Sequence, residues 1–332
     1  MNRMLTTALA VSGLLGLGAT AAPAQDLETL RGNVRVDGSS TVFPITEAVA
    51  ESFSEDAPKV RVTVGVSGTG GGFKRFAANE IDISDASRPI KGKEMKLMTD
   101  NGVEYIELPV AYDGLTVVVN PENKWVDHLT VDELKKIFLA DSAAKMWSDV
   151  RPEWPARPIK IFSPGTDSGT FDYFKEVIAG KKGSIRSDMS VSEDDNVLVN
   201  GVAGEKDAMG FFGCAYFMEN KDKLRAVPIQ NPVTTENVMP TMETIETGRY
   251  APFSRPLFIY VNARSARKPE VRRFVEYYLE ECPELVGEVG YVRLPEEMYD
   301  RSKTNFSKRR LGTQFHDSAG ESVSGALTQV YQ

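Results

Sequence analysis

The chain has 332 residues, enough for two domains of ordinary size, and its 39 basic and 47 acidic residues give a formal net charge of −8. Such an acidic surface argues against nucleic acid or anionic lipid as the partner. It does not exclude a small anion, because neutral N–H and hydroxyl donors in a cleft act locally.

The first 24 residues have the pattern of a secretory signal peptide. Arg3 supplies a positive start, Leu5 to Leu17 is apolar and small, and Ala22-Pro-Ala24 fits the small-x-small cleavage rule. The apolar stretch is short for a membrane anchor and ends in the cleavage signal. We therefore expect cleavage near Ala24 and an exported, soluble product that begins at Gln25.

Three strand–polar loop units occupy the first part of the remaining chain, and a helix is expected after each of the first two. Each has a short apolar or alternating strand that leads into a loop rich in small and polar residues. Pro44 suits the first turn of the helix after the first loop, and a helix from Phe73 to about Asn79 follows the second. The strands are predicted at 34–36, 59–66 and 81–83, and the loops at 38–44, 67–72 and 84–89.

Apolar strands in the middle of the chain suit the centre of a sheet. We expect strands at 105–108 and 115–119 on either side of Ala111-Tyr-Asp-Gly114. A further central strand is expected at 257–261, directly after Arg255-Pro256.

Thr130-Val-Asp-Glu133 is a capping box, which predicts a helix that ends near Leu139. The polar tail from about Lys303 is expected to be loosely packed. The remaining elements are predicted at 159–162, 196–204, 208–212 and 269–281.

One loop pattern occurs twice, about a hundred positions apart. Gly68-Thr-Gly-Gly-Gly-Phe-Lys-Arg-Phe76 and Gly165-Thr-Asp-Ser-Gly-Thr-Phe-Asp-Tyr-Phe174 share Gly-Thr, two residues, Gly and then Phe-x-x-Phe, with one extra residue in the second copy. In that copy Ser168 and Thr170 are good N-caps, and the N–H groups of the first helical turn favour an anion. Each copy alone could be an ordinary capped helix, but the two together suggest two lobes that face one ligand.

Strands that alternate with helices predict an α/β fold of mainly parallel sheet. Ligands of such folds lie at the carboxyl ends of strands, where all four polar loops fall. We expect no cofactor and no metal, because Cys214, Cys282, His128 and His316 lack ligand-like spacing. Both cysteines are expected to stay unpaired, since a bond between them would join the two lobes.

The templates for catalysis fail. Phe73 stands where a Walker loop needs Gly before Lys74, and Ser168 is not central between glycines as in a nucleophile elbow. A Ser-dependent hydrolase or phosphatase would need a general base beside Ser168, and neither histidine has a sequence reason to lie there. The chain is therefore predicted to bind a ligand without transforming it.

Four motifs occur in the order found in one known family. Gly38-Ser-Ser-Thr-Val-Phe-Pro44, Ser67-Gly-Thr-Gly-Gly-Gly-Phe73, Asp82-Ile-Ser-Asp-Ala-Ser-Arg-Pro89 and Thr166-Asp-Ser-Gly-Thr170 resemble the periplasmic phosphate-binding protein of the Pst-type ABC transporter (PstS-like). The resemblance covers nearly the whole chain after the signal. It implies a two-lobed, type II-like periplasmic binding protein fold with two hinge strands, which holds inorganic phosphate between its lobes and delivers it to a membrane permease. We expect a periplasmic monomer, and sulfate, molybdate and phosphonate are the alternative ligands.

The resemblance also implies which groups bind the anion. Two departures concern charge: Pro164 stands where many members carry Arg, and Ser87 where those members carry Asp. Arg88 is therefore expected to supply the guanidinium from the other lobe, with a surface salt bridge as the alternative. The neutral donors are expected from Ser40, Thr41 and Val42, from Thr69 with Ser67 as runner-up, and from Ser168, Gly169 and Thr170.

Selection of phosphate over sulfate would need a carboxylate, because a carboxylate accepts a hydrogen bond that only a protonated ligand can donate. Asp113 is the first candidate, and Asp85 and Asp167 are its rivals. Hinge strands near 112–119 and 255–261 would divide the chain into lobe one, 25–112 plus 262–332, and lobe two, 113–261.

Overall fold

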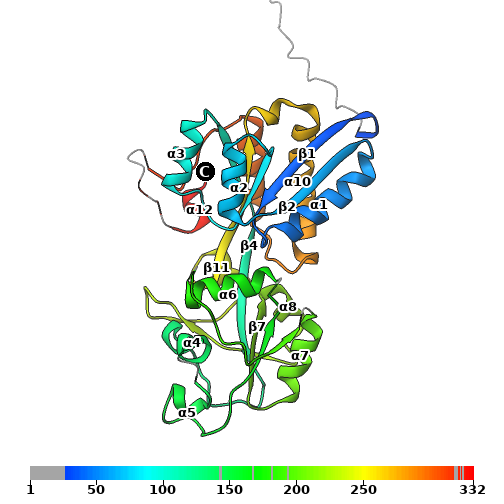
Figure 1. Ribbon diagram of the computed structural model, residues 1–332. Coiled ribbons are helices and arrows are strands. Elements are labelled where there is room, and N and C mark those ends of the chain that lie inside the picture. The colour runs from blue at the N-terminus through cyan, green and yellow to red at the C-terminus, as the bar shows by residue number, and fades with distance from the viewer. Residues whose placement is uncertain are drawn as a thin grey trace, which may run out of the picture.

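The computed structural model describes residues 27–332 except 142–143, 167, 181, 193, 318–320, 322 and 324. The predicted signal peptide and Asp167 therefore lie outside the described residues. Two lobes are joined by two strands, β4 (Tyr105–Val119) and β11 (Ser254–Asn262), which run from one lobe toward the other (Figure 1). This architecture confirms the predicted α/β fold with two lobes and two hinge strands.

Lobe one is a sheet with helices on both faces. Its strands lie in the order β2-β1-β3-β11-β4, and β1 is parallel to both β2 and β3. Helices α1 and α10 cover one face, and α2 and α3 lie over the other (Figure 1). The elements are η1 (Leu27–Thr29), β1 (Gly32–Gly38), α1 (Phe43–Asp56), β2 (Val60–Val66), α2 (Thr69–Ala77), β3 (Ile83–Ala86), α3 (Gly92–Asp100), η2 (Ser265–Arg267), α10 (Pro269–Glu288), α11 (Glu296–Ser307) and α12 (Leu327–Val330).

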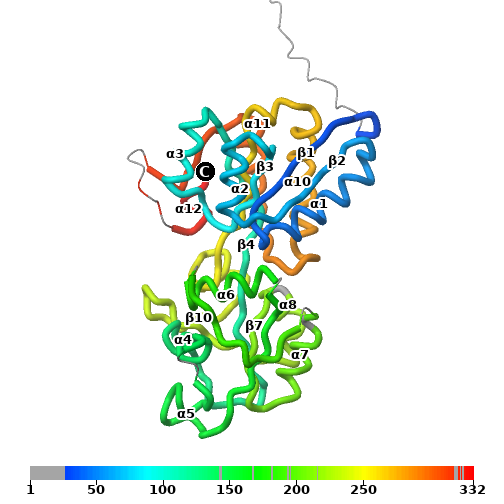
Figure 2. The backbone as a smooth tube through the Cα atoms, in the orientation of Figure 1, coloured from blue at the N-terminus to red at the C-terminus, as the bar shows by residue number. Residues whose placement is uncertain are grey.

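Lobe two continues the sheet in the order β4-β7-β5-β6, with β5 parallel to β6 and β7. The capping box predicted at Thr130 is present, and it begins α4. The tube in Figure 2 follows the chain through this lobe. The elements are α4 (Val131–Phe138), α5 (Trp147–Val150), β5 (Lys160–Pro164), α6 (Gly169–Ala179), β6 (Ser190–Ser192), α7 (Asp195–Gly204), β7 (Ala208–Gly213), α8 (Cys214–Glu219), β8 (Arg225–Ala226), β9 (Ile229–Gln230), β10 (Asn237–Val238) and α9 (Met242–Glu246).

β4 is one continuous strand, whereas the sequence predicted two strands around 111–114. All 15 of its residues are buried. Residues 105–114 pair with β11, and 115–119 pair with β7. Asp113 does not interrupt the strand, because Arg255 lies opposite it on β11 and pairs with its carboxylate.

The predicted division of the chain stays a prediction, and the pairing of β11 suggests another one. Phe258–Val261 pair with β3 in the sheet of lobe one, whereas the predicted bounds 113–261 place them in lobe two. Because β4 changes its partner from β11 to β7 after Gly114, we propose crossing points near Gly114 and Ser254. The sheet is also less parallel than predicted, since β4 and β11 run antiparallel to their neighbours.

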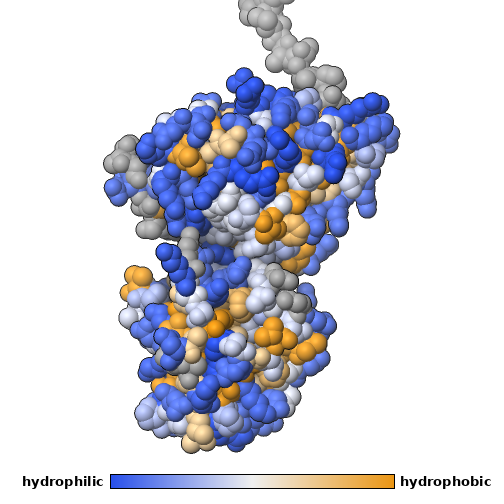
Figure 3. Space-filling model, viewed as in Figure 1, coloured by the Kyte–Doolittle hydropathy of each residue, from blue (hydrophilic) through white to orange (hydrophobic). Residues whose placement is uncertain are grey.

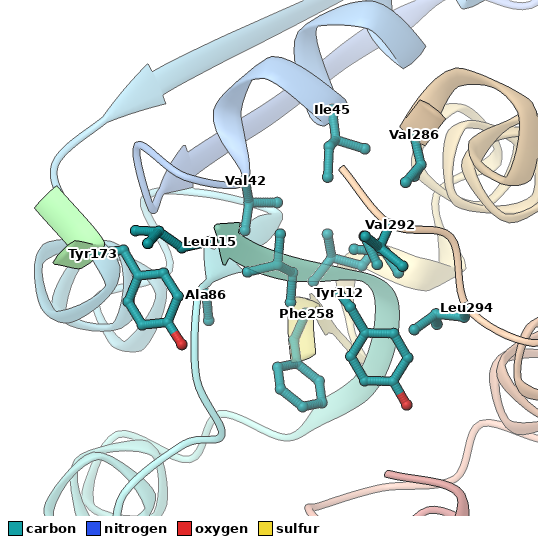
Figure 4. Packing of buried hydrophobic residues seen from close by; sticks show 14 of the residues in the cluster. Val42, Ile45, Ala86, Tyr112, Leu115, Tyr173, Phe258, Val286, Val292 and Leu294 are labelled. Carbon is teal, nitrogen blue, oxygen red and sulfur yellow. The ribbon is translucent and has the colours of Figure 1, made fainter. Parts of the chain in front are cut away.

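The larger of two hydrophobic clusters among the described residues contains residues of both lobes, and Figure 4 shows part of it. Phe171, Phe174 and Ile178 recur near helical spacing in the sequence, a pattern that predicts a buried stripe, and all three are buried on α6. The ring of Phe174 stacks on Phe211 with centroids 3.9 Å apart. Burial of such side chains contributes about 1.5–3 kcal/mol each. The stripe therefore fixes which face of α6 is left to meet lobe one.

The C-terminal segment packs against lobe one, so the prediction of a loose tail from Lys303 is wrong. Phe315 and Tyr331 are buried. The carboxylate of Glu107 is also buried and needs hydrogen-bond donors. The tail supplies two of them: Thr313 Oγ1 donates to Glu107 Oε2 at 2.6 Å, and the Gln314 N–H donates to Glu107 Oε1 at 3.1 Å.

Candidate functional site

A cavity of ≈ 620 Å³ lies between the lobes, at the narrow waist seen in Figure 3. The loops after β1, β2 and β3 border it on one side, and α6 and the start of β11 border it on the other. The two sides meet at one point of the cavity, where Arg255 Nη2 donates to Thr41 Oγ1 at 3.1 Å. Of the predicted site residues, the lining includes Ser40, Thr41, Thr69, Ser87 and Arg88.

The loop after β1 presents its hydroxyl groups at the N-terminus of α1. Ser40 and Thr41 line the cavity, and Pro44 lies in the first turn of the helix as predicted. Val42, in contrast, is fully buried, and its N–H donates to Ser39 O at 3.2 Å. Val42 therefore supports the loop and does not line the cavity.

The loop after β2 turns Thr69, and not Ser67, toward the cavity. α2 begins at Thr69, four residues earlier than predicted, and Thr69 Oγ1 accepts the Ser87 N–H at 3.2 Å. Ser67 Oγ donates instead to Asp37, which also pairs with Arg75. Thr69 and Ser87 thus place two hydroxyl groups, 3.2 Å apart, at the carboxyl ends of β2 and β3.

Helix α6, which follows the second copy of the loop pattern, lies against lobe one at its first residue, Gly169. Ser168 is the N-cap of α6, and its Oγ accepts the Thr170 N–H at 3.2 Å. A Cβ on Gly169 would lie 2.9 Å from Thr41 Cα, so only glycine fits there without a shift. The cavity lining does not include Ser168, Gly169 or Thr170. Gly169 nevertheless lies against Thr41, and Thr41 is a lining residue.

The predicted guanidinium is occupied by an acid of its own lobe. Arg88 lines the cavity, yet its Nη1 and Nη2 donate to the two carboxylate oxygens of Glu94 at 2.8 and 2.7 Å. The stated alternative was a surface salt bridge; the structure contains a salt bridge, but a largely buried one. The burial of both partners, with side chains 19% and 7% exposed, favours a stable pair.

A second arginine, which sequence reasoning missed, borders the same cavity. Arg255 Nε donates to Asp113 Oδ2 at 3.2 Å, and Arg255 Nη2 donates to Thr41 Oγ1 at 3.1 Å. Its guanidinium carbon lies 3.6 Å from the centre of the Tyr173 ring. The only sequence signal was its place, directly before Pro256 at the start of a central strand.

Neither described candidate for the accepting carboxylate lines the cavity. Asp113 is 2% exposed; burial raises its pKa, and Arg255 opposes that rise. Asp85 is fully buried and accepts from Thr46 Oγ1 of α1 at 2.9 Å. Burial raises the pKa of Asp85 to about 8. The carboxylates that do line the cavity are Asp172 and Glu176, both on α6.

The alternative of a serine hydrolase gains no support from the site. Across the described ranges, no His or Lys nitrogen hydrogen-bonds to Ser168. His316 Nε2 lies 2.9 Å from Ile90 O, and His128 Nδ1 lies 3.0 Å from Asp127.

Three further features of the described residues concern a metal site, a membrane-spanning helix and a disulfide. No group of three or more His, Cys, Asp or Glu among them is arranged to hold a metal, and no described helix is long and apolar enough to cross a membrane. Cys214 and Cys282 are buried and are not joined to each other.

Comparison with known proteins gives consistent matches over most of the chain. A family model described as the PBP superfamily domain matches residues 23–281. Protein SphX of Synechococcus elongatus is 48% identical over 317 residues, which cover 94% of this chain and 92% of that protein. The phosphate-binding protein PstS of Staphylococcus saprophyticus is 40% identical over 302 residues, which cover 90% and 92%.

Solved structures of similar fold include phosphate-binding proteins. A possible phosphate-binding protein from Planctomyces limnophilus is 49% identical, has a TM-score of 0.82 and matches over 85% of this chain and 100% of its own. An ABC-type phosphate transport receptor from Vibrio cholerae has a TM-score of 0.62 at 22% identity over 79% and 100%, which shows a common fold.

Proposed function

The chain belongs to the PstS-like family of periplasmic binding proteins, and we propose that it holds inorganic phosphate between its lobes. It is the phosphate-binding component of a Pst-type ABC transporter and not an enzyme. The observation that carries the proposed site is the convergence of three Ser- and Thr-rich loops from lobe one on the cavity that α6 and Arg255 border from the other side.

The geometry suits a tetrahedral anion. Hydroxyl groups of Ser40, Thr41, Thr69 and Ser87 lie at the carboxyl ends of strands, where the N-termini of α1 and α2 favour negative charge. Ser168, Gly169 and Thr170 would join them from α6 when the lobes approach. Closure would thus complete the site and make the shape that a membrane permease recognises.

The route to this function follows from the N-terminal sequence. We propose that the signal peptide is removed near Ala24 and that a monomer works in the periplasm, where it delivers phosphate to the permease. Nucleic acid is not proposed as a partner, because the net charge is −8.

Titration calorimetry of the chain from Gln25 onward with phosphate, sulfate, molybdate and a phosphonate tests the proposal. Phosphate should bind most tightly, at least tenfold above each of the others, a difference of about 1.4 kcal/mol. If sulfate or molybdate bound as tightly as phosphate, the chain would be a binding protein for a different oxyanion. No heat and no thermal stabilisation with any of the four would contradict the proposal.

A further inference from the structure

Arg255 sits at the point where β11 crosses between the lobes. Its side chain is 16% exposed and touches three elements: the loop after β1 through Thr41, strand β4 through Asp113, and helix α6 through Tyr173. The Tyr173 OH donates to Pro252 O at 2.6 Å, which fixes the ring on which the guanidinium lies. The guanidinium is therefore held flat between the two halves of the cleft.

The donors of this guanidinium are not all used. A guanidinium carries five N–H groups. Among the described residues, Arg255 makes hydrogen bonds from Nε to Asp113 and from Nη2 to Thr41, while Nη1 lies 3.9 Å from Glu176 Oε2, beyond hydrogen-bond distance. The same cavity contains Arg88, but Glu94 engages both of its Nη atoms. Of these two arginines, Arg255 is the one that can turn a fork toward an anion.

We propose that Arg255 is the guanidinium that binds the anion in this chain and that Asp113 positions it, a role other than accepting a hydrogen bond from the ligand. The inference rests on the proposed function and deepens it. A fork of N–H donors fits two oxygens of a tetrahedral oxyanion. Because Thr41 is itself a lining residue, the ligand can take over the Nη2 donor that Thr41 holds now.

The position of Asp113 supports this role. The side chain of Asp113 is only 3% exposed, and its Oδ2 faces Arg255 Nε and Nη2, both at 3.2 Å. Asp113 is not among the residues that line the cavity, and its Oδ2 is engaged on the guanidinium. Such a carboxylate fixes the orientation of the fork and compensates its charge when the cleft is empty.

Affinities of four variants test the proposal, with thermal unfolding as the check that each is folded. Arg255→Lys retains the charge and loses the fork, so phosphate affinity should fall tenfold or more. The matched control is Arg88→Lys, an arginine of the same cavity, which should change affinity less than threefold. Asp113→Asn should lower the affinities for phosphate and for sulfate by the same factor. In the double variant with Arg255→Lys, it should lower the phosphate affinity no further than Arg255→Lys alone.

The outcomes separate this inference from the proposed function. If the wild type binds no phosphate, the proposed function fails. If the wild type binds phosphate but Arg255→Lys binds equally well, or Arg88→Lys loses more, Arg255 is not the binding guanidinium. If Asp113→Asn changes the ratio of phosphate to sulfate affinity, Asp113 accepts from the ligand, and the positioning role is wrong.

Discussion

The two sides of the cleft meet the ligand with different chemistry. Lobe one presents loops at the ends of parallel strands, with the hydroxyl groups of Thr41, Thr69 and Ser87. Its arginine at the cavity is neutralised by Glu94. The opposite side presents charged groups: Asp172, Lys175 and Glu176 on α6, and Arg255 at the hinge.

The two sides therefore contribute different kinds of interaction to anion binding. Neutral donors at strand ends can hold an oxyanion without a large cost of desolvating charge, but each contributes modestly. A guanidinium in a partly buried site adds a stronger, charge-assisted bond. That guanidinium lies at the crossing strands, where its Nη2 already donates to Thr41 of lobe one.

The largest expected effect concerns a buried carboxylate of lobe one. Asp85 and Asp113 are both buried, but Asp113 has Arg255, whereas Asp85 has the hydroxyl of Thr46 and an Oδ1 without a hydrogen-bond partner among the described residues. Burial raises the pKa of Asp85 to about 8, and the charge of Asp37 adds to the rise. The ordinary pKa of an aspartate in an unfolded chain is about 3.9.

Between those two pKa values the unfolded chain has lost a proton that the folded chain retains. The contribution of Asp85 to the free energy of unfolding should therefore fall as the pH rises from about 4 to about 8. Asp85→Asn removes this loss, so its stability relative to wild type should grow across that window by on the order of a few kcal/mol. Urea unfolding at several pH values measures it, with exposed Asp100→Asn as control. Parallel curves for wild type and Asp85→Asn would contradict the account.

Hydroxyl groups from opposite sides should matter about equally. Ser168→Ala on α6 and Thr69→Val on α2 each remove one hydrogen bond to a charged ligand, which costs about 1.5–3 kcal/mol of phosphate binding. Ser192→Ala is the matched control, because Ser192 Oγ also accepts an N–H two residues on, from Asp194 at 3.0 Å, but lies outside the lining. A loss from only one of the two site variants would mean that a single side holds the anion.

A smaller effect should come from the point where the sides touch. Gly169→Ala places a Cβ 2.9 Å from Thr41 Cα, which must push α6 away from the loop. Overpacking of this kind costs about 1–3 kcal/mol, and part of it can be relieved by lobe movement. We expect weaker phosphate binding with little change in thermal stability. Gly204→Ala, with nothing within 4 Å, is the control, and equal affinity of the two variants would exclude close approach at Gly169.

The sequence predicted the local features of the site well. Loop positions, the Ser168 cap, the buried stripe of α6 and the capping box at Thr130 follow from patterns within a few residues, and the structure contains them. Of the two candidates in the Gly-rich loop, Thr69 lines the cavity and Ser67 does not; a contact of Thr69 with the anion stays a prediction.

The structure differs from the predictions mainly where the partner of a residue could not be recognised in the sequence. Asp113 and Gly114 suggested an interruption of β4, because the residues that pair with them on β11 are distant in the sequence, and Arg255 lies 142 positions from Asp113. Arg88 was predicted to bind the ligand, which stays a prediction, and its salt bridge with Glu94 was not recognised although Glu94 is only six positions away. Arg255 was missed because nothing near it in the sequence shows that three elements converge on its side chain.

The central claim is that groups from both sides of the cleft bind the anion and that the positive charge comes from Arg255 at the hinge. The structure of the phosphate complex tests this claim most directly. We predict phosphate oxygens about 2.7–2.9 Å from the Nη atoms of Arg255, the spacing of charge-assisted hydrogen bonds. Other oxygens should contact the hydroxyl groups of Thr69 and Ser168, while Arg88 remains bound to Glu94. A phosphate that contacts lobe one alone, or that draws Arg88 away from Glu94 and leaves Arg255 on Asp113 and Thr41, would contradict the account.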